Sequence, residues 1–426
     1  MQEPRCLFRG FRPTSGWRAV PAAMCLALIL AGCGGSAGDQ DIRSDDGSPV
    51  DQQDSVGSAL PPRNSSAKVW TGSELLVYGG LSLQPSDGYL NDAYFVDPRS
   101  LLITERLPDP PFEPPLSGPT GAEFNGLVLV AGMPCDLKAA EGGLKCESLG
   151  ARAALLDLDR SIWREVAMPS EAEDAVNISV LGVSGEAFIV EMGSAPSDFW
   201  RYRPVTGDWA RIEAPMLGEM TESVPPGIWD GPAIAQCLSG DTLIVLESLS
   251  PMRPLTHMAP QGVRTHQLDL TGEAGWLTAD DPSIAPSDRP TIQCTDRGGA
   301  LLLPTNAPLR GFWQLDPSSN GWRRVESMGA SIPETPALHT AYLSQGWTGE
   351  EVVFLNGSNV EMPAYRTATG SWRLAPAPGV VTTEPLVWTG DLFVTEAVGN
   401  DGQSFPGAPK GPLPSSGSLY SFEMAT

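Results

Sequence analysis

The chain has 426 residues, including 46 Gly and 41 Pro, and only 18% of its residues are charged. It is long enough to bury a large core, but Gly and Pro are too frequent for long helices, so the composition favours an all-β fold. Asp and Glu number 51 against 27 Lys and Arg. This negative charge repels polyphosphate and excludes nucleic acid as a partner.

Residues 1–32 have the organisation of an export signal. Four arginines carry the charge of the leader: Arg5, Arg9, Arg12 and Arg18. An apolar run over residues 21–32 follows, and it is too short to span a bilayer comfortably. The run leads into Leu30-Ala31-Gly32-Cys33, which resembles the lipobox of bacterial lipoproteins.

The lipobox resemblance implies cleavage before Cys33 and lipid attachment, with palmitate among the acyl groups, to the Cys33 thiol. The protein would then be held at the cell membrane through this lipid, on the extracytoplasmic side. The alternative is an ordinary secretory leader with a chance cysteine. Removing the leader takes away four Arg and one Glu, which leaves 23 basic and 50 acidic residues and a net charge of −27.

Residues 33–62 contain six aspartates and almost no apolar side chains. Such a segment cannot offset the entropy lost on ordering, so we expect a flexible acidic tether. The folded domain is then expected over residues 63–426. The acidic surface is interpreted as a means of keeping an exported protein soluble, with an acid-lined cation site as the alternative.

Four of the seven cysteines remain after export and lipidation, and an even number in an oxidising compartment indicates disulfides. Three pairings are possible. We favour Cys135 with Cys146, which closes the loop between them, and Cys237 with Cys294, for a reason that the repeat supplies.

A repeated hairpin runs through the domain, with a small turn between two apolar strands. Seven glycines mark its copies: Gly72, Gly126, Gly185, Gly240, Gly298, Gly349 and Gly390. The intervals between them are 54, 59, 55, 58, 51 and 41 residues. A second hairpin follows in each copy, as in Trp313–Trp322, so one unit holds four strands, a to d.

A four-stranded sheet cannot bury both faces alone, whereas sheets stacked around an axis can. A period near 50 residues therefore predicts a β-propeller of about seven four-stranded blades, with six or eight blades as the alternatives. The last copy stops at strand c, near Met424. Either residues just before Ala67 complete this blade, or it has three strands.

The copies resemble the kelch family. The first copy has the Gly79-Gly80 doublet after strand b, which the other copies reduce to a single Gly or lose, and five copies have a tryptophan in strand d, found at Trp163, Trp209, Trp276, Trp322 and Trp372. The first copy departs from this pattern, because Arg106 lies where the strand-d tryptophan is expected. The resemblance covers roughly residues 66–424 and implies a kelch-type propeller.

The repeat also explains one disulfide. Cys237 and Cys294 end strand a of neighbouring copies, in the matching contexts Gln236-Cys237 and Gln293-Cys294. Strands a approach one another at the centre of a propeller, so a bridge there would join two blades. It would close a loop of 57 residues, with a gain of about 3 to 4 kcal/mol in the loop-entropy model.

The sequence shows no catalytic, metal-binding or cofactor-binding motif. His257, His266 and His339 lie in different copies without a shared ligand spacing. Trp70, Trp229, Trp347 and Trp388 recur near strand a, which favours packing between blades over a carbohydrate-stacking ring. We therefore predict no cofactor, metal or catalytic residue.

The long connections lie on the face formed by the b/c and d/a loops. They span residues 131–150, 213–228, 247–263 and 397–417. Long loops in repeat proteins gather on the functional face, although tolerated insertions would look the same. The sequence predicts a binding or protein-interaction module at the cell envelope, with an unidentified protein or glycan ligand on this face.

Two other functions remain open. One is a glycan-active hydrolase or lyase that uses carboxylates on the long-loop face, and the other is an assembly scaffold. An enzyme should place two carboxylates with shifted pKa values in a central pocket, whereas a binding module should not.

Overall fold

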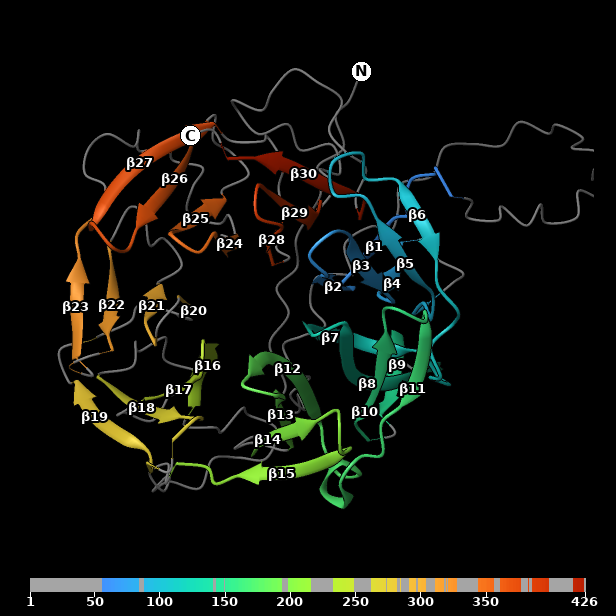
Figure 1. The fold of residues 1–426 in the computed structure, drawn as a ribbon, viewed down its shortest axis with the longest axis horizontal. Helices are drawn as coiled ribbons and strands as arrows, with labels where there is room; N and C mark the ends of the chain where they lie inside the picture. The colour runs from blue at the N-terminus through green and yellow to red at the C-terminus, as the bar shows by residue number, and fades with distance from the viewer. Residues whose placement is uncertain are drawn as a thin grey trace, which may run out of the picture. The chain divides into compact units, whose positions relative to one another are not determined.

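The apolar runs of the repeat form seven antiparallel sheets that follow one another around a ring in the computed structural model of the chain (Figure 1). The structure describes residues 56–83, 88–140, 143–148, 150–193, 198–215, 233–248, 262–272, 274–281, 284, 291–295, 298–303, 311–317, 319, 321–327, 344–355, 361–376, 382, 385–397 and 417–424. The predicted signal peptide, Cys33 and most of the predicted tether lie outside these residues.

Blades 1 to 4 each run from an inner strand a to an outer strand d. Blade 1 is β2 (Ala67–Trp70), β3 (Leu75–Tyr78), β5 (Ala93–Val96) and β6 (Ile103–Arg106). Blade 2 is β7 (Leu116–Phe124), β8 (Leu127–Ala140), β10 (Arg152–Asp157) and β11 (Ile162–Glu165), with β9 (Gly143–Ser148) paired to β8. Blade 3 is β12 (Asn177–Ser184), β13 (Ala187–Gly193), β14 (Asp198–Arg203) and β15 (Asp208–Ile212). Blade 4 is β16 (Ala233–Ser239), β17 (Thr242–Ser248), β18 (Val263–Asp269) and β19 (Leu277–Asp281).

Blades 5 to 7 continue the order. Blade 5 is β20 (Thr291–Cys294), β21 (Ala300–Leu303), β22 (Phe312–Asp316) and β23 (Gly321–Val325). Blade 6 is β24 (Ser344–Trp347), β25 (Glu351–Leu355), β26 (Glu361–Arg366) and β27 (Ser371–Pro376). Blade 7 is β28 (Val387–Trp388), β29 (Leu392–Glu396) and β30 (Leu419–Glu423). The prediction of an all-β, seven-bladed propeller is confirmed.

Among the described residues, three short elements lie outside the blades: β1 (Arg63–Asn64) and β4 (Leu81–Ser82), which pair with each other, and the 3₁₀ turn η2 (Ser170–Ala172). In the part of the chain that the structure describes, no helix is long and apolar enough to cross a membrane.

The turns follow the chemistry of the sequence. Between β7 and β8, Asn125 and Gly126 both have positive φ, at 50° and 77°. This combination is typical of a two-residue hairpin turn, whose twist matches that of the strands. The marker glycines therefore sit where the chain reverses between strands a and b.

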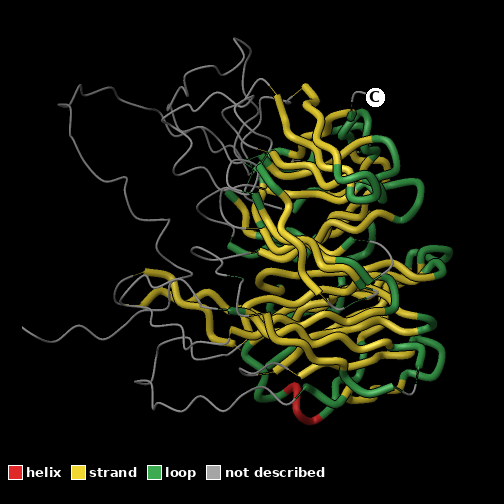
Figure 2. The backbone as a smooth tube through the Cα atoms, turned by 90° about the vertical axis from the view of Figure 1, so that its left-hand side faces the viewer, coloured by secondary structure: helices red, strands yellow, loops and turns green. Residues whose placement is uncertain are grey.

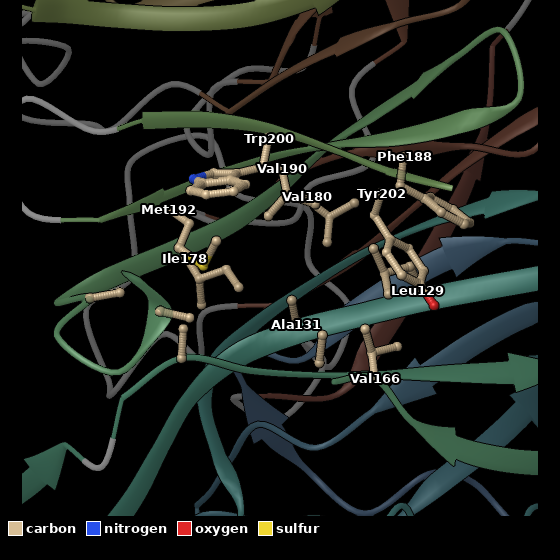
Figure 3. Close-up of a cluster of buried hydrophobic side chains, with 14 of the residues drawn as sticks. Leu129, Ala131, Val166, Ile178, Val180, Phe188, Val190, Met192, Trp200 and Tyr202 are labelled. Atoms are coloured by element: carbon tan, nitrogen blue, oxygen red, sulfur yellow. The ribbon is translucent and has the colours of Figure 1, made fainter. Parts of the chain in front are cut away.

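The core lies between the blades. Blades 2 and 3 share a cluster in which Leu129 and Ala131 face Val190 and Trp200 (Figure 3). Successive side chains of a strand point to opposite faces, so each sheet buries one set against the blade before it and the other against the blade after it. This stacking satisfies both faces of every sheet.

Several strand-d tryptophans link their blade to the one before it. Trp163, Trp209, Trp322 and Trp372 lie in strand d as predicted, and Trp276 directly precedes β19. Three indole nitrogens donate to a carbonyl just after strand d of the preceding blade: Trp209 to Ala167 at 2.8 Å, Trp276 to Glu213 at 2.6 Å and Trp372 to Glu326 at 3.2 Å. The repeated tryptophan thus marks a hydrogen bond between neighbouring blades as well as the length of the repeat.

The ring closes between blade 7 and blade 1, where β28 contacts β2. Within the described residues, blade 7 has three strands, which is one of the two expected outcomes. The segment before Ala67 does not complete blade 7. Residues 57–59 instead pair with blade 1, through bonds such as Gly57 N–H to the Ile103 carbonyl at 2.8 Å.

The same segment also touches blade 7, because the backbone N–H of Arg63 donates to the Gly417 carbonyl at 2.9 Å. Arg63 is fully buried and pairs with Asp92, with an Nη1–Oδ1 distance of 2.6 Å. Residues 57–62, which the sequence places in the tether, therefore contact the propeller.

Residues 131–150, expected as a long b/c loop, are mostly strand. β8 continues to Ala140 and β9 pairs with it, so blade 2 carries a two-stranded extension that projects beyond the sheets when the blades are seen from the side (Figures 1 and 2). The expectation of an irregular loop is wrong here, because the chain after β8 folds back and pairs with the end of that strand.

Candidate functional site

Blade 4 departs from its neighbours on the face that it turns toward blade 3. In blade 3, Trp200 lies in strand c between Val190 and Arg211. In blade 5, Trp313 occupies the same register position, between Leu302 and Arg324. Blade 4 has His266 there, between Val245 and Thr278.

The next position on this face also changes character. Blade 3 pairs Met192 of strand b with Asp198 of strand c, whereas blade 4 pairs Glu247 with Arg264. Both Glu247 and His266 are buried, with exposed fractions of 3% and 1%. Burying such groups is costly unless they are paired. The polar side chains that take the place of apolar core residues in blade 4 therefore need hydrogen-bond partners.

The compensation is a hydrogen-bonded network across strands b, c and d. His266 Nε2 lies 3.2 Å from Glu247 Oε2, and His266 Nδ1 lies 3.0 Å from Thr278 Oγ1. The Arg264 Nη1 atom is 3.5 Å from the same Glu247 oxygen. Every buried member of the network therefore has a partner.

At the outer end of the network, Arg264 holds Asp280 in a bidentate pair, with Nε–Oδ1 and Nη2–Oδ2 distances of 2.6 and 3.1 Å. The two residues are directly opposite on strands c and d. The hydrogen bond from Arg264 lowers the pKa of Asp280, and the same bond raises the pKa of Arg264. Both groups are thus charged at neutral pH.

This face lines a pocket of about 680 Å³ that opens between blades 3 and 4. Its walls are Glu213, Ala214, Pro215, Arg264, His266, Gly275, Trp276, Thr278 and Asp280. The volume lies within the range of small-molecule sites. A smaller side chain at the position of Trp200 and Trp313 leaves this space open.

The pocket lies beside two of the predicted long loops. Glu213 to Pro215 begin the 213–228 connection, and Arg264 directly follows the 247–263 connection. These are d/a and b/c connections, so Arg264 and Asp280 stand at the end of blade 4 that meets the long-loop face. The rest of both loops lies outside the described residues.

Trp276 forms the aromatic wall. Its indole N–H is bonded to the Glu213 carbonyl, and its ring meets that of His266 edge-on at a centroid distance of 6.4 Å. The indole is therefore held in place from both sides, and its orientation does not depend on a ligand. Such a wall is preorganised for contact.

The pocket walls differ in the chemical groups that they offer. The carboxylate of Asp280 is ionised and paired, so it is poorly suited to donate a proton as a general acid. Among the described residues, no group of three His, Cys, Asp or Glu side chains is placed to hold a metal ion. The walls instead offer one aromatic surface, one guanidinium, one carboxylate and one hydroxyl.

The predicted cysteine pairs lie at bonding distance. Cys135 and Cys146 link β8 to β9 in the blade 2 extension, 11 residues apart in the sequence. Cys237 and Cys294 link the inner strands of blades 4 and 5, 57 residues apart. Cys294 ends its strand as expected, whereas Cys237 lies two residues before the end of β16.

Of the remaining predicted residues, Trp70 ends β2 and is half-buried. Trp347 and Trp388 pack against core clusters, as the packing interpretation expects. His257, His339 and Trp229, with most of residues 397–417, lie outside the described residues.

Of the pocket residues, only Trp276 and His266 stand out in the sequence, and Trp276 does so as a strand-d tryptophan of the repeat. His266 was weighed only as a metal ligand, and its partners Glu247 and Thr278 come from other strands. A signal was present in the repeat: strand c of blade 4 reads Thr265-His266-Gln267, where blade 5 reads Phe312-Trp313-Gln314. The replacement of two aromatic core residues by Thr265 and His266 distinguishes blade 4 from blade 5 in the sequence.

The fold defines a class of protein, the seven-bladed β-propellers. No family model matches the chain, and no curated protein matches it. Among solved structures, it is similar to the β-propeller domain in the crystal structure of Myceliophteria thermophila Cps50 (Swd1). The TM-score is 0.48 at 12% identity, over 87% of this chain and 99% of that one.

Proposed function

We propose that this protein is a lipid-anchored, kelch-type β-propeller that acts as a binding or interaction module on the extracytoplasmic side of the cell membrane. The observation that carries the binding role is the departure of blade 4 from the repeat. A closed ring of similar sheets provides a rigid frame, and blade 4 replaces core residues with a paired polar network beside an open pocket. Polar groups at core positions that open into a cavity are typical of functional sites.

The proposed anchor has its support in the sequence alone. A basic leader, an apolar run and Leu30-Ala31-Gly32-Cys33 follow one another in the order of a lipoprotein signal. Four remaining cysteines in two close pairs suit an oxidising compartment. The anchor would hold the propeller within reach of envelope components.

Labelling with palmitate tests the anchor. Cells that express the protein should incorporate labelled palmitate into it, and a Cys33→Ala variant should remain unlabelled. Equal labelling of the two chains, or no labelling of either, would overturn the lipid anchor.

A pull-down tests the binding role. The mature lipoprotein, purified in detergent and immobilised, should retain a defined set of envelope components that mass spectrometry identifies. A chain denatured before immobilisation serves as the control. Retention of the same material by both would contradict a binding function of the folded propeller.

The second candidate is a glycan-active hydrolase or lyase, and the observation in its favour is the presence of Glu213, Glu247 and Asp280 in or beside one pocket. Binding is the better supported function, because Glu247 is committed to His266 and Arg264, and Asp280 to Arg264. Release of reducing ends from envelope polysaccharide by the purified protein would favour the enzyme instead.

A further inference from the structure

From the pocket between blades 3 and 4, and building on the proposed binding function, we infer that the ligand is a neutral saccharide, held by stacking on Trp276 and by hydrogen bonds to Arg264, Asp280 and Thr278. The inference concerns the chemical class of the ligand and the place where it binds. It follows from the shape, the charge and the polar groups of the pocket walls.

The first step is the aromatic wall. One edge of the Trp276 indole is anchored, because its N–H donates to the Glu213 carbonyl at 2.6 Å. The ring is partly exposed and borders the pocket. Aromatic rings bury large apolar areas at small entropic cost, and the C–H face of a pyranose is an apolar surface of matching size.

The second step is the polar pair. Arg264 and Asp280 stand directly opposite each other on strands c and d, with side-chain exposures of 29% and 48%. The pair offers N–H donors beside carboxylate acceptors, which suits neighbouring hydroxyl groups that donate and accept together. Hydrogen bonds to charged groups are the stronger ones.

The third step is charge. The described walls carry Glu213 and Asp280 against one guanidinium, and Glu247 lies buried behind them. The whole chain is also strongly acidic. An anionic ligand would be repelled, whereas a cationic ligand would find the Asp280 carboxylate already paired. A neutral, hydroxyl-rich ligand fits this balance.

The fourth step is the comparison with blade 6. Trp372 makes the corresponding bond to the Glu326 carbonyl, but its ring packs among Phe312, Phe354 and Tyr365. The same link between blades is thus made by a tryptophan whose ring packs against other aromatic rings. Trp372 therefore provides a matched control for a role of Trp276 that is purely structural.

The test is isothermal titration of the mature lipoprotein, purified in a detergent that carries no sugar. The probes are three neutral tetrasaccharides, cellotetraose, maltotetraose and N-acetylchitotetraose, with tetragalacturonate as the anionic probe and tetralysine as the cationic probe. We expect saturable binding of at least one neutral probe and none of the two charged probes.

Variants locate the site. Trp276→Ala and Asp280→Asn should each lower the affinity for the neutral probe by about tenfold or more. Trp372→Ala should leave the affinity for this probe unchanged. Melting temperatures of all three variants show whether each remains folded. If Trp276→Ala unfolds the chain, the loss of affinity is measured with Asp280→Asn and Thr278→Ala instead.

Three results would overturn the inference: no neutral probe binds, a charged probe binds instead, or the neutral probe binds equally well to the pocket variants. The proposed function has a separate outcome. If the pull-down succeeds with wild type and equally with Trp276→Ala, the protein remains a binding module and the saccharide pocket is wrong.

Discussion

At the scale of single residues, Glu247 is the group on which the blade 4 network depends. It accepts from His266 and faces Arg264 while almost fully buried. Replacing it with Ala leaves the buried His266 imidazole without its carboxylate, while Arg264 keeps only Asp280. Removal of one partner from a buried pair costs about 3 to 5 kcal/mol. We expect Glu247→Ala to lower the free energy of unfolding by about 3 kcal/mol, measured by urea denaturation.

An exposed pair provides the control for Glu247. Asp198 pairs with Arg211 at 2.7 Å, and the Arg211 side chain is 56% exposed. Asp198→Ala should cost less than about 1 kcal/mol. Equal losses in the two variants would mean that burial of Glu247 has no energetic consequence.

Asp280 gives a prediction on pH. Its pKa in the folded protein lies below the ordinary value, because Arg264 donates hydrogen bonds to the carboxylate. A carboxylate with a lowered pKa stabilises the fold above its unfolded pKa, and this contribution is lost as the pH falls through the folded pKa. The loss should therefore occur below about pH 4.

Asp280→Asn removes that titration. Between pH 7 and pH 3, the melting temperature of the variant should fall less than that of wild type, while Thr278→Ala, which removes no charge, should follow the wild-type curve. The effect should be small, since Asp280 is half exposed. A variant curve parallel to wild type over the whole range contradicts the account.

At the scale of elements, the inner strand β24 approaches blade 7 closely at Gly346. A Cβ atom there would lie 2.5 Å from Phe393 Cε1 and 2.8 Å from Leu386 Cβ. Gly346→Ala should thus force blades 6 and 7 apart and destabilise the fold by about 1 to 3 kcal/mol. Thermal unfolding, compared with wild type, measures the loss.

Gly275→Ala is the matched control, because nothing lies within 4 Å of a Cβ atom at that position. It should change stability by less than about 0.5 kcal/mol. If Gly346→Ala were equally neutral, the close approach of the two blades would be disproved.

The elements show what the sequence could predict. The marker glycines and the strand-d tryptophans located the hairpins, because the a/b turn recurs in every copy and the strand-d tryptophan in most of them. The extension β8–β9 could not be predicted from the repeat, since its pairing depends on residues inserted between strands b and c. The pocket was missed because Glu247, His266 and Thr278 meet only through the register of three strands.

At the scale of the whole molecule, the two cysteine pairs should contribute unequally. Cys237–Cys294 closes 57 residues and joins two blades, whereas Cys135–Cys146 closes 11 residues within one hairpin extension. The loop-entropy model gives about 4 kcal/mol for the first and about 3 kcal/mol for the second. The first also holds together the centre of the ring.

We therefore expect Cys237→Ser with Cys294→Ser to lower the melting temperature more than Cys135→Ser with Cys146→Ser. Thiol titration of the unfolded wild-type chain, which should find no free thiol among these four, checks the pairing beforehand. A larger loss from the hairpin pair would contradict the role of Cys237–Cys294 as a link between blades.

The central claim is that the propeller is a frame and that its binding function lies where blade 4 departs from the repeat. The most direct measurement fills the pocket with the residues of blade 3, through Glu247→Met and His266→Trp together. Buried ion pairs can often be replaced by apolar residues without loss of stability, so circular dichroism should show a folded chain. The quantity measured is the amount of radiolabelled envelope material that the immobilised protein retains. We predict that the filled variant loses the retention seen with wild type, and undiminished retention by a folded, filled variant would contradict the account.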